Sequence, residues 1–144
     1  MTLSAVIFPI GEDQYAVAAH TVREVVCEPH ATRLPTAPTV LLGAFNLRGE
    51  VVPMFDVAAL LGIGALNDMP FALVVNTAAG PAGLVVSGLP KVALLDEPIG
   101  PSELRGSLGM YRVDDGIALM VDVEALLVPH TTSPLAATED VVDQ

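Results

Sequence analysis

Residues 54–61 read Met-Phe-Asp-Val-Ala-Ala-Leu-Leu, and residues 120–127 read Met-Val-Asp-Val-Glu-Ala-Leu-Leu. Six of these eight positions are identical, at an offset of 66 residues. Each copy begins like the end of a strand, continues through an aspartate, and finishes with apolar residues enough for about one helical turn. Self-similarity at a fixed spacing indicates that the chain contains two related units.

The segments before the two copies also resemble each other. Residues 6–18 and 72–86 each contain two short apolar runs separated by a turn rich in Gly, Asp or Pro, a pattern typical of hairpins. No long amphipathic helix is evident. We therefore predict a mainly β fold of two small barrels, with lobes at about 1–68 and 69–129 and a possible exchange of the first strand between them. Residues 130–144 are small, polar and acidic, and we predict a disordered tail there.

The charge balance narrows the class of partner. The chain has 17 acidic and 6 basic residues and a net charge of -11. Nucleic acids and anionic membranes both need a cationic face, which so few basic residues do not easily supply. Hydrophobic residues make up 52% of the chain, enough for a core and for some apolar surface that could contact other proteins. We expect a soluble, cytoplasmic protein.

Two aspartates at equivalent positions of the repeat invite a catalytic hypothesis. Asp56 and Asp122 would form an acid–base dyad if their carboxylates shared a proton, which makes a small hydrolase a distant alternative. Each aspartate, however, directly precedes a predicted helical turn, where an N-cap aspartate accepts backbone hydrogen bonds. Capping is the better interpretation, and no catalytic residue is predicted.

Metal and cofactor sites have little support in the sequence. His20, Cys27 and His30 are metal-ligand types close together, but their spacing matches no compact zinc pattern and a fourth ligand is not evident. Neither G-x-G-x-x-G nor a Walker sequence occurs. We predict no metal and no cofactor.

The segment from Gly43 to Asp56 carries the more interesting chemistry. Asn46 and Gly49 both tolerate left-handed backbone angles, so we expect a sharp turn around Leu47 and Arg48. A guanidinium there either braces the loop or faces acidic groups of a partner. In an extended stretch at 22–26, Val22 and Glu24 would share one side and Arg23 the other.

These segments together resemble the CheW family, the coupling proteins of bacterial chemosensory arrays. The likeness covers roughly residues 3 to 128. It rests on an ordered series of short motifs: Tyr15-Ala16-Val17, Val22-Arg23-Glu24-Val25, Leu34-Pro35, Asn46-Leu47-Arg48-Gly49, Pro53-Met54-Phe55-Asp56, Gly83-Leu84-Val85-Val86 and Val121-Asp122-Val123.

The resemblance implies a fold of two five-stranded SH3-like β-barrels within one domain over 1–129. It also implies a non-enzymatic adaptor that joins chemoreceptor cytoplasmic tips to the regulatory domain of a CheA-type histidine kinase. The adaptor would be cytoplasmic and recruited to receptor arrays at the membrane. It would neither bind nucleic acid nor insert into the membrane. It would bind the receptor through five positions. Those positions are Val22, Glu24, Gly43, Asn46 and Arg48.

The chain departs from the family pattern mostly in its second half. Ser87-Gly88 stands where the family usually has an acidic residue, and Pro90 interrupts the following segment. The kinase-contact residues are not predicted. The departures leave open a paralogue that serves a pilus, surface-sensing or second-messenger pathway.

Overall fold

A computed structural model describes residues 2–32, 38–66, 68–101, 107–114 and 116–127. The predicted tail at 130–144 lies outside this described part. The fold is mainly β, as expected. Its elements are β1 Leu3–Ile10, β2 Asp13–Ala18, the 3-10 turn η1 Ala19–Thr21, β3 Val22–Cys27, β4 Leu41–Leu47, β5 Glu50–Asp56, α1 Val57–Leu60, β6 Phe71–Thr77, β7 Gly80–Val86, β8 Lys91–Leu95, β9 Ser107–Val113 and β10 Gly116–Val121.

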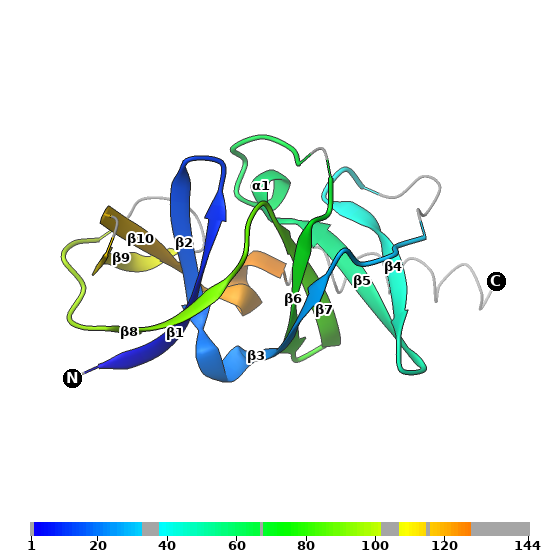
Figure 1. Ribbon diagram of the computed structural model, residues 1–144, viewed down its shortest axis with the longest axis horizontal. Coiled ribbons are helices and arrows are strands. Elements are labelled where there is room, and N and C mark those ends of the chain that lie inside the picture. Colours follow the sequence, from blue (N-terminus) through cyan, green and yellow to red (C-terminus); the bar gives the residue numbers. More distant parts are fainter. Residues whose placement is uncertain (1, 33–37, 67, 102–106, 115, 128–144) are drawn as a thin grey trace.

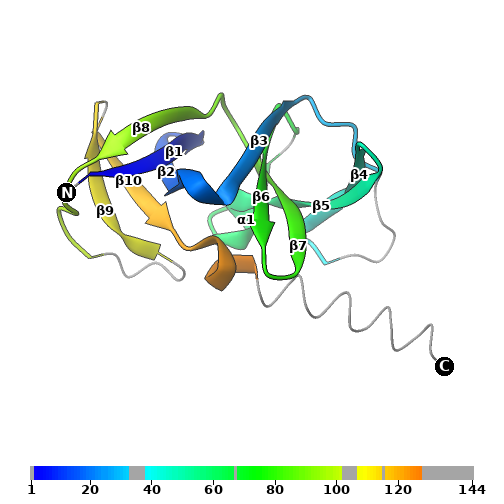
Figure 2. The ribbon, with the colours of Figure 1, turned by 90° about the horizontal axis from the view of Figure 1, so that it is seen from below.

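The strands form two five-stranded sheets that lie side by side, with helical turns between them (Figures 1 and 2). One sheet has the order β8-β1-β2-β10-β9 and the other β3-β6-β7-β5-β4. Each contains one parallel pair, β2 with β10 and β5 with β7. The mainly β fold with two five-stranded units is therefore confirmed.

The sheets do not follow the two halves of the repeat. The β1–β2 hairpin joins β8, β9 and β10 from the second half, whereas the β6–β7 hairpin joins β3, β4 and β5 from the first. The exchange thus involves both whole hairpins, and a division near residue 68 does not separate the sheets. The two hairpins have similar apolar patterns, so these patterns alone do not indicate which sheet each hairpin joins.

The sheets are open, not closed as barrels. Within the described residues, β4 and β9 have no ladder with the other edge strand of their sheet and form only isolated bridges with the segments that follow β3 and β8, Ala44 with Thr32 and Met110 with Gly100. Prolines at 29, 98 and 101 flank these bridges. Proline has no N–H to donate, so a ladder is disfavoured at these three positions.

The main core lies between the two sheets. It takes buried side chains from both, including Phe8, Tyr15, Phe55, Leu73 and Leu84. Further apolar clusters cover the opposite faces, with Ile7 and Met120 on one sheet and Val52, Met54 and Val74 on the other. Central strands are therefore buried on both faces, which explains their nearly continuous apolar sequences.

Polar contacts also join the sheets, at the tips of the exchanged hairpins. Ser87, just after β7, accepts a hydrogen bond from Gly11 N–H at 3.1 Å and donates one to the Pro9 carbonyl at 2.9 Å. Glu124 accepts from Ala78 N–H at 2.7 Å, at the β6–β7 turn. A hydroxyl can both donate and accept, whereas a carboxylate only accepts. The serine at 87 therefore has a clear structural role.

No helix in the described part of the chain is long and apolar enough to cross a membrane.

Candidate functional site

The β4–β5 hairpin ends in a two-residue loop formed by Arg48 and Gly49. Leu47 pairs with Glu50 across the turn, and φ is 51° at Arg48 and 88° at Gly49. Positive φ at both central residues defines a type I′ turn, whose twist matches that of the flanking strands. The expectation of a sharp turn with Gly49 in a left-handed conformation is right, but the second left-handed residue is Arg48 and not Asn46. Asn46 instead accepts a hydrogen bond from Gly49 N–H through Oδ1, at 2.7 Å.

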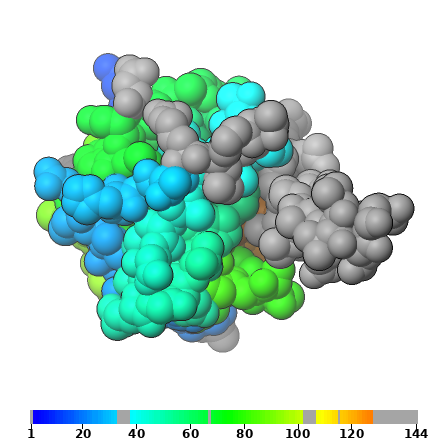
Figure 3. Space-filling view, turned by 90° about the vertical axis from the view of Figure 1, so that its right-hand side faces the viewer, coloured from blue at the N-terminus to red at the C-terminus, as the bar shows by residue number. Residues whose placement is uncertain are grey.

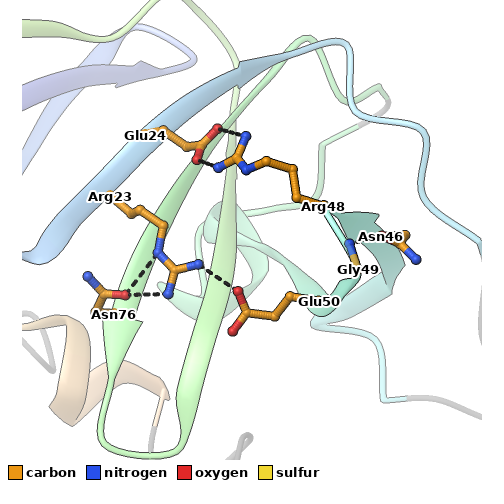
Figure 4. A network of polar contacts seen from close by, with 7 residues as sticks. All are labelled: Arg23, Glu24, Asn46, Arg48, Gly49, Glu50 and Asn76. Atoms are coloured by element: carbon orange, nitrogen blue, oxygen red, sulfur yellow. Dashed lines mark hydrogen bonds and ion pairs between the residues drawn. The ribbon is translucent and has the colours of Figure 1, made fainter.

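The guanidinium of Arg48 reaches across to Glu24 on β3. It forms a two-nitrogen contact with the Glu24 carboxylate, with one N–O distance of 3.4 Å. The Arg48 side chain is 69% exposed and the Glu24 side chain 29%. The hydrogen bonds and charge of Glu24 raise the pKa of Arg48. The result is a permanent cation that its partner orients (Figure 4) and that is largely exposed to solvent.

A second ion pair lies beside the first. Arg23 contacts Glu50 at 2.7 Å, and its Nε and Nη2 donate to Asn76 Oδ1 at 3.2 and 2.9 Å. The side chains of Arg23 and Glu50 are 34% and 46% exposed. Figure 4 shows both arginines bridging between β3 and the β4–β5 turn, and Figure 3 shows these segments, in blue and cyan-green, meeting on one surface.

β3 is irregular where it carries these charged residues. The register of β3 on β6 shifts between Val22 and Glu24. The strand is irregular at this point, and the long side chains of neighbouring Arg23 and Glu24 both contact residues of the β4–β5 turn. The predicted alternation is still seen in the burial of β3, where Glu24 is half-buried and Arg23 is exposed. The sequence reasoning missed Arg23, Glu50 and Asn76, although the matching order of charges in Arg23-Glu24 and Arg48-Gly49-Glu50 was a visible signal.

The structure brings only some of the predicted site residues into contact. Glu24 and Arg48 touch directly, and Asn46 holds the turn that carries Arg48. Val22 is half-buried against the central core, and Gly43 is buried in β4 next to a second register shift, between Leu41 and Gly43. Val22 and Gly43 thus lie at irregular points of the two edge strands that carry the charged residues.

The two aspartates of the repeat act as helix caps. Asp56 is 1% exposed and accepts hydrogen bonds from Ala59 N–H at 3.2 Å and Leu66 N–H at 2.9 Å. Asp122 accepts from Ala125 N–H at 3.2 Å, at the start of helical residues 123–127. They end strands of different sheets, β5 and β10, and each carboxylate is engaged by its own helical turn. This arrangement supports the capping interpretation and gives the dyad hypothesis no geometric basis.

His20, Cys27 and His30 do not form a metal site. His20 lies in η1 and Cys27 at the end of β3. In the described part of the chain, no three or more His, Cys, Asp or Glu side chains are grouped so that they could hold a metal ion.

Substituting Arg48 by asparagine should show how much the left-handed backbone at this arginine lowers the stability of the protein. Asn tolerates a left-handed backbone and Asn-Gly is the preferred type I′ pair, so we expect Arg48→Asn to raise Tm by about 2–4 °C. Arg48→Ala is the matched control, because it also removes the guanidinium but leaves a β-carbon in the disfavoured conformation. Thermal unfolding followed by circular dichroism measures both, and equal Tm values for the two variants would contradict the prediction.

The comparisons with known proteins agree with each other. A family model described as CheW-like domain matches residues 4–129. The chain is 30% identical to a probable chemotaxis protein CheW of Rhizobium etli, over 83% of each chain, and 29% identical to chemotaxis protein CheW of Klebsiella aerogenes, over 84% of this chain and 79% of that protein. Protein PilI of Pseudomonas aeruginosa is 33% identical over 58% of this chain and 48% of its own length. The crystal structure of scaffolding protein TtCheW from Thermoanaerobacter tengcongensis superposes with a TM-score of 0.78, at 26% identity, over 88% of both chains.

Proposed function

The chain belongs to the family of CheW-like domains, and from this membership we propose that it is a non-enzymatic adaptor of a chemosensory pathway. It would couple the cytoplasmic tips of chemoreceptors to the regulatory domain of a CheA-type histidine kinase. Recruitment from the cytoplasm to receptor arrays at the membrane is part of the same proposal. Relatives named as chemotaxis proteins and a solved relative named as a scaffold support it.

The single observation that carries the receptor contact is the oriented cation at the β4–β5 turn. Arg48 occupies a left-handed backbone conformation that is uncommon for residues other than Gly, Asn and Asp, because the β-carbon crowds the following carbonyl oxygen. A disfavoured backbone at an exposed position is explained when the side chain has a function there. Exposed ion pairs contribute little to stability, so recognition of a partner accounts for Arg48 better than folding does.

A helical receptor tip fits the chemistry of this edge. Binding of a helix in a groove combines apolar anchors with a few oriented charges that set its register. Val22 and Gly43 would border the contact, Glu24 and Arg48 would supply the charges, and Asn46 would hold the turn.

The kinase contact requires a separate surface. In Figure 1, β8 lies at the opposite end of the molecule from the β4–β5 turn. β8 is an edge strand, and its Val92 and Leu94 side chains are 72% and 71% exposed. An apolar edge of this kind is suited to a protein contact, so we assign the kinase regulatory domain to it. Two distant surfaces would allow the adaptor to hold both partners at once.

A related adaptor role in a pilus or surface-sensing pathway is the second candidate. The match to Protein PilI favours it, but over 58% of the chain against 83% for the Rhizobium etli relative. The two candidates share a mechanism and differ in the receptor and kinase that are joined.

Reconstitution tests the proposal. The purified chain is mixed with the CheA-type kinase and membranes carrying a chemoreceptor from the same cell, and kinase autophosphorylation is measured. We expect receptor control of the kinase only when the chain is present, and co-sedimentation of kinase with the membranes. A kinase that responds equally to the receptor with and without the chain would refute the adaptor function. Repeating the assay with a receptor and kinase from the cell's pilus-linked system distinguishes the two candidates.

A further inference from the structure

The two segments that supply the ion pairs, β3 and the β4–β5 turn, have the same order of charges. Along β3 the order is positive then negative, at Arg23 and Glu24. Around the turn it is again positive then negative, at Arg48 and Glu50. The two pairs lie side by side and link the segments in antiparallel order, with Arg23 bound to Glu50 and Glu24 bound to Arg48 (Figure 4).

The guanidinium of Arg23 is held more firmly than a surface arginine usually is. It makes one contact with Glu50 at 2.7 Å and two with Asn76 Oδ1 at 2.9 and 3.2 Å. The side chain of Glu50 nevertheless remains 46% exposed. Exposed ion pairs contribute only about 0–1 kcal/mol to the free energy of unfolding. A gain in stability alone therefore does not account for an arginine that is held by three contacts. Fixed charges at an edge mainly decide which partner is accepted.

Building on the receptor contact proposed above, we infer that the Arg23–Glu50 pair selects among receptor tips. The accepted tip is a helix that presents an acidic side chain to Arg48 and a basic one to Glu50. These two residues are two positions apart, so their Cα atoms are less than about 7 Å apart. Side chains three or four residues apart on a helix are separated by a similar distance, about 5–6 Å between Cβ atoms.

The same geometry excludes other tips. A helix with acidic groups at both positions would satisfy Arg48 but place a like charge against Glu50, which is unfavourable at a contact from which water is displaced. Arg48 would therefore supply attraction that many acidic tips could use, and Glu50, held in place by Arg23, would supply the repulsion that rejects some of them.

The test is a charge reversal that keeps the ion pair. Arg23→Glu is combined with Glu50→Arg, and the Asn76 amide can rotate so that its NH2 group donates to the new carboxylate. Affinity is measured by isothermal titration for purified helical-hairpin tips of every chemoreceptor of the native cell. We expect the tip that wild type prefers to lose affinity at least about tenfold, and tips with acidic groups at both positions to gain. Melting temperature should change by less than about 3 °C.

A single substitution guards against a misfolded double variant. Glu50→Gln removes the repelling charge and should reduce the spread of affinities across the tips. Glu12→Gln, the same change at the exposed β1–β2 turn of the other sheet, should leave that spread unchanged. If the reversal and Glu50→Gln both preserve the ranking and the affinities within twofold, the pair does not select the receptor. If wild type binds no tip at all, the proposed receptor contact itself fails, and the inference with it.

Discussion

Asp56→Ala is expected to lower the free energy of unfolding by about 2–4 kcal/mol, the largest stability effect we predict for a single polar side chain of this protein. Loss of a helix N-cap costs about 0.5–2 kcal/mol, and a second N–H that is partly shielded from water and left without a partner adds about 1–3 kcal/mol. Both apply here, because Asp56 is 1% exposed and accepts from Ala59 N–H and from Leu66 N–H. Urea unfolding followed by circular dichroism measures the loss.

The repeat supplies a matched control for this prediction. Asp122 occupies the equivalent position and caps the helical turn at 123–127 through Ala125 N–H. It is only partly buried, so water can take over the hydrogen bond when the carboxylate is removed. We expect Asp122→Ala to cost about 1 kcal/mol. Equal losses at 56 and 122 would show that the second bond and the burial of Asp56 contribute nothing.

The elements that depend on neighbouring residues could be predicted from the sequence. The repeated strand, aspartate and helical turn at 54–61 and 120–127 are such elements. An aspartate before a helical turn is favoured wherever that pattern occurs, and alternating apolar residues specify a strand independently of its partner. The turn after Asn46 belongs to the same class, because Gly49 permits the positive φ that a tight hairpin requires.

The features that depend on distant residues could not be predicted. The two hairpins carry similar patterns, so nothing within β1–β2 or β6–β7 specifies which sheet each joins. The bulge at Arg23 exists only relative to the register of β3 on β6. The contacts of Arg23 with Glu50 and Asn76 likewise depend on distant strands, which is why the sequence indicated Arg48 and Glu24 but not the pair beside them.

Arg48→Glu is expected to abolish receptor binding while leaving the protein folded. The change removes the cation and places a carboxylate opposite Glu24, so an acidic group of the tip would meet two negative charges in place of an ion pair. A reversal at a contact from which water is displaced should weaken binding by at least about 30-fold. Because the Arg48 side chain is 69% exposed, we expect Tm to fall by less than about 3 °C.

Two further variants separate the possible causes of that loss. Arg48→Lys keeps the charge but not the planar two-nitrogen contact with Glu24, so an intermediate loss would show that orientation of the cation matters as well as its sign. Arg48→Glu combined with Glu24→Arg restores an ion pair with the polarity reversed, and should bind as poorly as Arg48→Glu alone if the receptor reads the charge at 48. Recovery in the double variant would instead mean that the pair acts by holding β3 against the turn.

Binding of the kinase regulatory domain, expected at the distant β8 edge, is the control and should remain unchanged in Arg48→Glu, Arg48→Lys and the double variant. A normal receptor affinity in Arg48→Glu would exclude Arg48 from the contact.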